Sequence, residues 1–162
     1  MKLASISENK TIEKRVAITP EIAKKYINLD FELSLPNNYG THLGFNDENY
    51  KSLGVNLTDN EHDLVKNADV LVQLGLPNDE KLSLLKENQT LIGSLNTFSN
   101  KKKLEDLKEK KINCFSLELL PRITRAQSMD ILSSQANLAG YKAVIEAFQN
   151  YEKAIPMMMT AA

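Results

Sequence analysis

Short apolar runs of strand length alternate with longer amphipathic runs along most of this chain of 162 residues. The runs predicted to be strands are residues 2–7, 31–35, 69–74, 89–95 and 112–119. Helices are expected between them, over residues 19–29, 46–54, 77–88 and 101–111. Strand-helix alternation of this kind predicts an α/β fold, flavodoxin-like or doubly wound, with a mostly parallel sheet and helices on both faces.

Capping residues mark several of these helix ends. Thr19 is expected to be an N-cap, with Pro20 at the first helical position, where its missing N–H does no harm. Asn78 or Asp79 is expected to cap the helix over residues 77–88, and Gly54 is expected to end the helix before it. Local signals therefore support the elements that the periodicity predicts.

Two polar segments need a separate interpretation. Residues 36–47, PNNYGTHLGFND, are rich in Gly, Pro and Asn and are expected to form an irregular surface loop. Residues 101–111, KKKLEDLKEKK, place Leu104 and Leu107 on one helix face, and the interleaved acids favour a solvated helix over a nucleic-acid patch.

The longest helical pattern runs from about Ser128 to Glu152, near the C-terminus. Small residues recur along it at helical spacing, with bulkier residues beside them. The small residues are Ala136, Ala139, Gly140, Ala143 and Ala147, and the bulky ones are Leu132, Leu138 and Ile145. We expect this helix to bridge to another domain and its small-residue ridge to support self-association. Residues 1–162 are predicted to be a single domain.

Composition narrows the choice of function. Twenty Lys and Arg against 21 Asp and Glu give a net charge of -1, so no basic field favours nucleic acid. The single Cys114 lies in an apolar run and is expected to be a small buried hydrophobe in a reducing cytosol. The N-terminus has no apolar signal core, and no window approaches the ~18 apolar residues of a membrane span.

Several common kinds of site have no motif in this sequence. The six glycines form neither G-x-G-x-x-G nor a P-loop, so this chain cannot hold a dinucleotide by itself. His42 and His62 are isolated, are expected to face solvent, and build no metal cluster with the one cysteine. No nucleophile elbow is present, and we name no catalytic residue.

One dense polar segment remains, which spans the end of the last predicted strand, a loop and the start of the long helix. Its polar residues include Arg122, Arg125, Gln127, Asp130, Ser133 and Gln135. Loops at the carboxyl ends of strands line the ligand crevice of open α/β sheets. A Gln amide, an Asp carboxylate and a Ser hydroxyl together match the donor and acceptor of a nicotinamide carboxamide. Alternatively, Ser128 or Asp130 simply caps the helix and the arginines are surface residues.

Two motifs resemble a known family. Residues 121–147, PRITRAQSMDILSSQANLAGYKAVIEA, are similar to the nicotinamide-contacting loop and following helix of the first domain of proton-translocating transhydrogenases, alpha subunit. Residues 8–21, ENKTIEKRVAITPE, resemble the opening segment that these transhydrogenases share with alanine dehydrogenases. The strand-helix order agrees in between, so the resemblance covers essentially the whole chain.

The resemblance assigns roles to particular residues. Arg122, Gln127 and Asp130 match the family's Arg-Gln-Asp loop, and Ser133 is the nearby hydroxyl on the nicotinamide side. These four residues are therefore the predicted cofactor-binding set. Arg15 matches an arginine that resembles a carboxylate clamp in alanine dehydrogenases, and here either that role or structural pairing with Glu13 is open.

Two positions of this sequence differ from alanine dehydrogenases and so help to choose between the two kinds of relative. Alanine dehydrogenases carry a substrate-binding Lys where this chain has Gln73, and a catalytic His where it has Asn96 or Thr97. Oxidative deamination needs a proton acceptor and a cation for the carboxylate. Direct hydride transfer between two nicotinamide rings needs only orientation and exclusion of water. The departures therefore favour a transhydrogenase.

The resemblance also implies cofactors and partners. Residues 155–162, IPMMMTAA, are expected to lead into a Rossmann domain of the same or a companion chain, which holds most of NAD(H). NADP(H) is expected on a partner subunit, next to membrane subunits that move protons. The chain is expected to be a homodimer, cytoplasmic and peripheral to the inner membrane, and inactive by itself. The alternatives are a non-catalytic interaction domain and an alanine dehydrogenase-like or saccharopine-type oxidoreductase.

Overall fold

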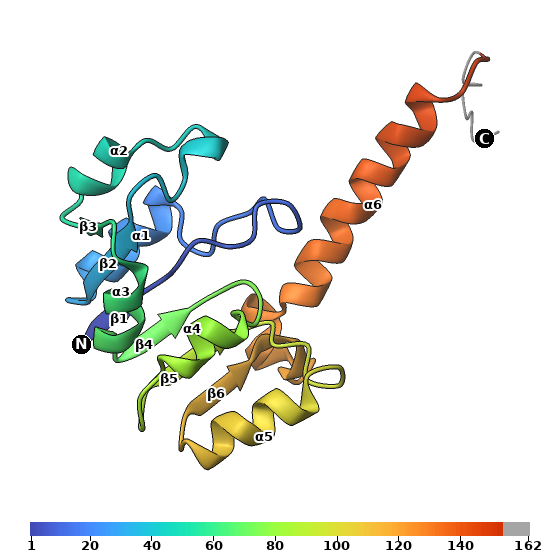
Figure 1. Ribbon diagram of the computed structural model, residues 1–162. Coiled ribbons are helices and arrows are strands. Elements are labelled where there is room, and N and C mark those ends of the chain that lie inside the picture. Colours follow the sequence, from blue (N-terminus) through green and yellow to red (C-terminus); the bar gives the residue numbers. More distant parts are fainter. Residues whose placement is uncertain (154–162) are drawn as a thin grey trace. The chain divides into compact units, whose positions relative to one another are not determined.

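The computed structural model describes residues 1–153, and the expected lead into a Rossmann domain at residues 155–162 lies outside them. The chain divides into two compact units, Met1–Leu119 and Leu120–Ala162 (Figure 1). We call the first the sheet unit and the second the helical unit.

The sheet unit is built on six parallel strands in the order β3-β2-β1-β4-β5-β6. The strands are β1 (Lys2–Ala4), β2 (Glu32–Pro36), β3 (Asn56–Thr58), β4 (Val70–Val72), β5 (Thr90–Gly93) and β6 (Asn113–Ser116). The predicted α/β class is confirmed. Without the short edge strand β3 the order is that of flavodoxin, and with β3 it is the doubly wound order. The order reverses between β1 and β4, which we call the switch point.

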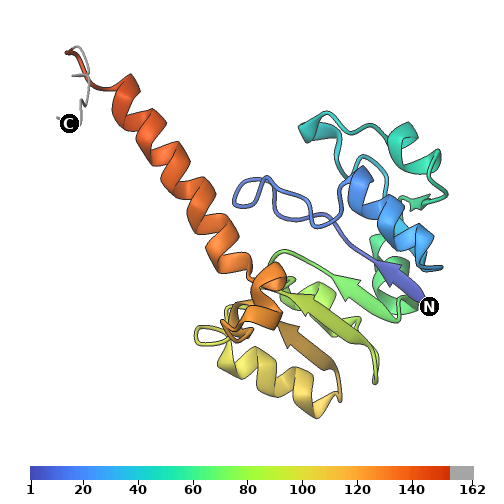
Figure 2. The ribbon, with the colours of Figure 1, turned by 180° about the vertical axis from the view of Figure 1, so that it is seen from behind.

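Helices cover both faces of the sheet (Figures 1 and 2). They are α1 (Pro20–Asn28), α2 (Asp47–Lys51), α3 (Glu61–Asn67), α4 (Asp79–Ser83) and α5 (Lys101–Glu109), with a 3-10 turn, η1 (Thr41–Leu43), before α2. Side chains alternate along each strand, so Leu3 joins the core under α1 and α2 while Ala4 joins the core under α3, α4 and α5. The sheet therefore separates two apolar cores.

Most predicted caps are confirmed. The Thr19 side chain accepts the N–H of Ile22, with Pro20 at the start of α1. Asn78, and not Asp79, caps α4 by accepting the N–H of Lys81. The strand β3 was not predicted, because a three-residue strand is too short to show periodicity. The helix α3 was not predicted either.

Three predictions in the sheet unit were wrong in part. All the predicted strands except that over residues 31–35 are too long, and the last one ends at Ser116 and continues as the 3-10 turn η2 (Leu117–Leu119). The loop over residues 36–47 contributes to the core, because Tyr39 is 2% exposed. Cys114 is exposed and not buried, because it lies on β6, the edge strand of the sheet.

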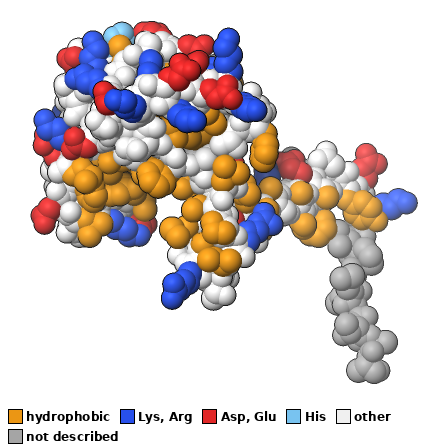
Figure 3. Space-filling view, turned by 90° about the horizontal axis from the view of Figure 1, so that it is seen from below, with side chains coloured by type: hydrophobic (Ala, Val, Ile, Leu, Met, Phe, Trp, Pro, Cys, Tyr) orange, Lys and Arg blue, Asp and Glu red, His pale blue; other side chains and the backbone are white. Residues whose placement is uncertain are grey.

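The helical unit contains a 3-10 segment, η3 (Thr124–Met129), followed by α6 (Ile131–Gln149). The long helix is thus confirmed but is shorter at both ends than the predicted range of about Ser128 to Glu152. Asp130 is the N-cap of α6. This agrees with the interpretation in which Ser128 or Asp130 caps the helix. No residue of α6 is buried, and hydrophobic side chains lie on its surface (Figure 3). Among the described residues, no helix is both long and apolar enough to cross a membrane.

Candidate functional site

The four predicted cofactor-binding residues lie together in the helical unit, around a cavity of about 520 Å³. The lining residues are Arg122, Ile123, Thr124, Gln127, Asp130, Ser133 and Ser134. A cavity of this size falls in the range of sites for small molecules and cofactors, ~300–1,000 Å³. Arg125 and Gln135, the other polar residues of the segment, do not line it.

The local sequence explains why these side chains converge. Two backbone hydrogen bonds between residues close in sequence turn the chain into η3. They run from the Ile123 N–H to the Pro121 carbonyl and from the Ala126 N–H to the Ile123 carbonyl. The segment η3 ends at Asp130, where α6 begins. The change of direction between the two helices places Gln127 and Ser133 on the same cavity.

Asp130 organises the charge in this cavity. Its Oδ1 accepts the Ser133 N–H at 3.0 Å, and its Oδ2 accepts the Ser133 hydroxyl at 2.7 Å. The Arg122 Nε lies 3.9 Å from the same Oδ2. The Ser133 hydroxyl, then its backbone N–H, and to a smaller extent Arg122, lower the pKa of Asp130. The carboxylate is therefore ionised at neutral pH, and the Ser133 hydroxyl, whose proton is engaged, offers its oxygen as an acceptor.

The remaining two side chains have different surroundings. The Gln127 amide forms no hydrogen bond within residues 1–153, so both its donor and its acceptor are available to a ligand. The Arg122 side chain is 69% exposed and keeps its positive charge at the cavity. Together the four predicted residues offer one cation, one anion, one amide and one hydroxyl oxygen, and Thr124 and Ser134 add two further hydroxyl groups to the lining.

Arg15 lies in the sheet unit and is paired locally. Its Nη2 is 2.6 Å from Glu13 Oε2, and its Nε donates to Glu13 Oε1 at 2.9 Å. The hydrogen bond from Arg15 is the main cause that lowers the pKa of Glu13. The structure therefore shows Arg15 paired with Glu13, which is one of the two roles that the sequence left open for Arg15.

A second polar constellation, which the sequence did not reveal, lies at the switch point. The Gln73 side-chain oxygen accepts the Ser5 hydroxyl and the Ile6 N–H, both at 2.8 Å. Its amide nitrogen donates to the Ile6 carbonyl and to Glu8 Oε1, both at 3.3 Å. The Ser5 hydroxyl also lies 2.8 Å from the Tyr39 hydroxyl. The only signal in the sequence is that Ser5 and Gln73 directly follow apolar strand residues, Ala4 and Val72, with Glu8 three positions after Ser5.

The loop after β5 contains Asn96 and Thr97, the positions that the sequence resemblance matches with a catalytic His of alanine dehydrogenases. Asn96 has a left-handed backbone, with φ of 48°. Glu118 accepts the N–H groups of Leu95 and Thr97, both at 3.1 Å. Burial raises the pKa of Glu118, but the Ser116 hydroxyl and the backbone donors outweigh it and lower the pKa. Glu118, a residue that the sequence interpretation missed, thus fixes a loop that presents no general base.

Both histidines are exposed, as predicted. His42 Nε2 lies 2.7 Å from the Lys14 carbonyl oxygen, and His62 Nε2 lies 3.0 Å from Glu80 Oε1. No group of three or more His, Cys, Asp or Glu side chains in the described part of the chain is arranged to hold a metal ion.

Comparison with known proteins places this fold and segment in one family. Residues 5–139 match the family described as alanine dehydrogenase/PNT, N-terminal domain, and the chain belongs to that family. It is 39% identical to the first part of the NAD(P) transhydrogenase subunit alpha of Rhodospirillum rubrum, over all of this chain and 44% of the relative.

Solved and more distant relatives agree. The crystal structure of transhydrogenase from Sinorhizobium meliloti superimposes with a TM-score of 0.86 at 36% identity, over 98% of this chain and 48% of that one. Alanine dehydrogenase 1 of Staphylococcus aureus is 26% identical over 90% of this chain and 38% of the relative. The chain therefore spans less than half the length of these relatives.

Proposed function

We propose that this chain is the nicotinamide-positioning part of a proton-translocating NAD(P) transhydrogenase, an oxidoreductase that transfers hydride from NADH to NADP. The observation that carries the proposal is that Arg122, Gln127, Asp130 and Ser133 line one cavity. The similarity to transhydrogenase alpha subunits over the whole chain supports it.

The lining matches the polar groups of a nicotinamide. The bound cofactor supplies the hydride, and the protein supplies orientation and exclusion of water. The Gln127 amide pairs with the carboxamide through both a donor and an acceptor, and the Ser133 oxygen accepts a carboxamide N–H. Asp130 holds Ser133 in this orientation and Arg122 faces the ribose or phosphate groups.

The sheet unit supports transhydrogenation over amino-acid oxidation. Deamination needs a base that takes protons from the amine, and a cation for the carboxylate. The corresponding positions hold Gln73, whose amide is engaged in four hydrogen bonds, and Asn96 or Thr97 in a fixed loop. Hydride transfer between two rings needs neither group.

The rest of the activity belongs to partners in this proposal. A Rossmann domain of the same or a companion chain holds most of NAD(H), and a partner subunit holds NADP(H). Membrane subunits carry the protons, so this chain is cytoplasmic and peripheral to the inner membrane, in a homodimeric assembly.

Substitutions in the complete enzyme test the proposal. Gln127→Ala removes hydrogen bonds to a neutral group and should lower the hydride-transfer rate about three- to tenfold. Asp130→Ser keeps a helix N-cap but removes the charge, and should lower the rate about ten- to a hundredfold. Single-turnover kinetics measure both effects, and the melting temperature should stay close to that of the wild type.

Gln149→Ala is the matched control, because Gln149 is an exposed glutamine at the other end of α6. It should leave the rate unchanged. Equal losses of rate and stability in Gln127→Ala, or a rate equal to that of the control, would refute a contact role.

The exposure of α6 favours a second candidate, a non-catalytic interaction domain of the same fold. In that case Gln127→Ala leaves hydride transfer intact while substitutions on α6 abolish assembly. An alanine dehydrogenase-like activity is tested by adding alanine and NAD to the complete protein, where we expect no NADH to form.

A further inference from the structure

Three N–H donors converge on one oxygen of Glu8, a residue to which no role is assigned above. Glu8 Oε1 accepts the Leu74 N–H at 2.8 Å, the Gln73 side-chain N–H at 3.3 Å and the Gly75 N–H at 3.4 Å. Consecutive backbone N–H groups of this kind form concavities that bind anions. The loop after β4 is therefore a carboxylate receptor, and Glu8 is the carboxylate in it.

The receptor lies where a ligand is expected in this fold. Glu8 follows β1 and the three donors follow β4, at the carboxyl ends of the two strands between which the strand order reverses. Open α/β sheets bind their ligands at this point. A cavity of about 330 Å³ opens there, and its lining includes Glu8, Asn9, Gln73, Asn78, Lys81 and Lys103.

The cations around this cavity are already engaged. Lys81 Nζ lies 2.8 Å from Glu61 Oε2, and Lys103 Nζ lies 2.6 Å from Asp79 Oδ1. The four hydrogen bonds of the Gln73 amide use both of its donors and both of its acceptor positions. A carboxylate that entered the cavity would meet the charge of Glu8 and compete for donors that Glu8 already uses.

We infer that Glu8 is an internal ligand, which occupies the small-carboxylate position at the switch point and excludes amino acids and oxo acids as substrates of this chain. The inference rests on the proposed function and deepens it. It explains the absence of amino-acid oxidation by a carboxylate position that Glu8 already occupies. It also predicts that removal of the Glu8 carboxylate opens the position to a carboxylate from solution.

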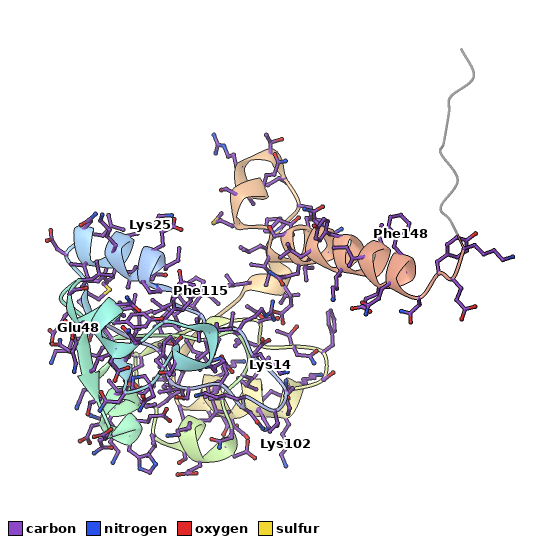
Figure 4. The ribbon with its side chains drawn as sticks, turned by 90° about the horizontal axis from the view of Figure 1, so that it is seen from above. Lys14, Lys25, Glu48, Lys102, Phe115 and Phe148 are labelled. Carbon is purple, nitrogen blue, oxygen red and sulfur yellow. The ribbon has the colours of Figure 1, made fainter. Side chains whose placement is uncertain are left out.

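Glu8→Ala in the 162-residue chain tests this by nitrogen-15 NMR, with acetate and pyruvate as probes. In the variant, the Leu74 and Gly75 amide signals should shift saturably with either probe and move back toward their wild-type positions. The wild type should bind at least about tenfold more weakly. Glu48→Ala, which removes an exposed carboxylate of α2 (Figure 4), is the matched control and should behave as the wild type.

Each result supports or overturns the inference. Saturable binding confined to Glu8→Ala supports it, and sodium chloride at equal ionic strength should not reproduce the shifts. Binding of pyruvate to the wild type at these amides, or no saturable binding to a folded Glu8→Ala chain, overturns it. Failure of the nicotinamide proposal would leave these outcomes unchanged, because the readout lies entirely in the sheet unit.

A titration of the wild type keeps the inference testable if Glu8→Ala does not fold. Burial raises the pKa of Glu8, opposed by the Leu74 and Gly75 N–H groups, while Glu13 raises it and Arg15 lowers it to a smaller extent. The Leu74 and Gly75 amide signals should follow the Glu8 carboxyl, with a midpoint above that of an ordinary glutamate. Amide signals that do not follow Glu8 would show that its carboxylate is not in the receptor, and would overturn the inference.

Discussion

The two units of this chain differ in how their apolar side chains are placed. In the sheet unit Leu33, Leu35 and Leu91 are 0% exposed, between layers that bury both faces of the sheet. In the helical unit Leu138 is 59% exposed and Phe148, seen on α6 in Figure 4, is 54% exposed. The sheet unit thus contains its own cores, whereas α6 derives stability from its cap and its helix propensity.

The polar sites of the two units also differ in how many of their donors and acceptors are hydrogen-bonded within the protein. At the switch point every donor and acceptor of Gln73 is used within the protein. Around the helical unit's cavity the Gln127 amide has no hydrogen bond among the described residues. A saturated network fixes a loop and rejects ligands, whereas an unsaturated lining is suited to bind one.

The largest effect should come from truncation of the sheet core. Leu91→Ala leaves a cavity between layers and should lower the free energy of unfolding by about 2–5 kcal/mol. Leu138→Ala, the matched change on exposed α6, should cost less than about 0.5 kcal/mol. Urea unfolding followed by near-ultraviolet circular dichroism measures both, and similar losses would contradict the difference in burial between the units.

The second largest effect, after that of Leu91→Ala, should be a loss of stability of the sheet unit at alkaline pH. Burial raises the pKa of Tyr39 to about 12, although hydrogen bonds with Ser5, Ile18 and Ala17 lower it, while an unfolded tyrosine ionises near 10. The Tyr39 contribution to stability is therefore complete below pH 10 and lost as the pH rises to 12, up to about 3 kcal/mol. Burial also raises the pKa of Tyr50, which acts in the same direction.

Urea midpoints between pH 9 and 12, with tyrosinate absorbance at 295 nm, measure this loss. Tyr39→Phe should weaken the dependence on pH, although it also leaves the Ala17 and Ile18 N–H groups without their acceptor. A wild-type midpoint that is constant up to pH 12 would show that the Tyr39 hydroxyl is not buried.

The smallest effect, of opposite sign, is expected in the helical unit. A Cβ added at Gly140 would meet no atom within 4 Å, and glycine in a helix costs about 0.5–1 kcal/mol relative to alanine. Gly140→Ala should therefore stabilise α6 by about that amount, seen as slower hydrogen exchange of its amides. The sheet unit should be unaffected, and a loss of assembly in the complete enzyme would mean that a partner backbone approaches Gly140.

Particular residues show how far the sequence can be interpreted. Thr19 was expected as a cap, as was Asn78 or Asp79, and one interpretation had Ser128 or Asp130 as the cap of the long helix. Thr19, Asn78 and Asp130 are the caps, and these expectations were within reach because capping depends on a few neighbouring residues. The burial of Tyr39 was missed because residues far along the chain provide its partners. Cys114 was placed in the core because an apolar run does not distinguish an edge strand from a central one.

The sequence by itself determined the α/β class and the long helix, and the family resemblance singled out four side chains that lie around one cavity, whose binding of a cofactor stays a prediction. These depend on periodicity and on residues close together in the chain, and the cavity that collects them lies within residues 122–134. Only the tertiary structure decided that Glu8 meets the loop after β4, because parallel pairing of β1 with β4 joins residues more than sixty positions apart. Such contacts arise from strand order, which no local pattern of residues encodes.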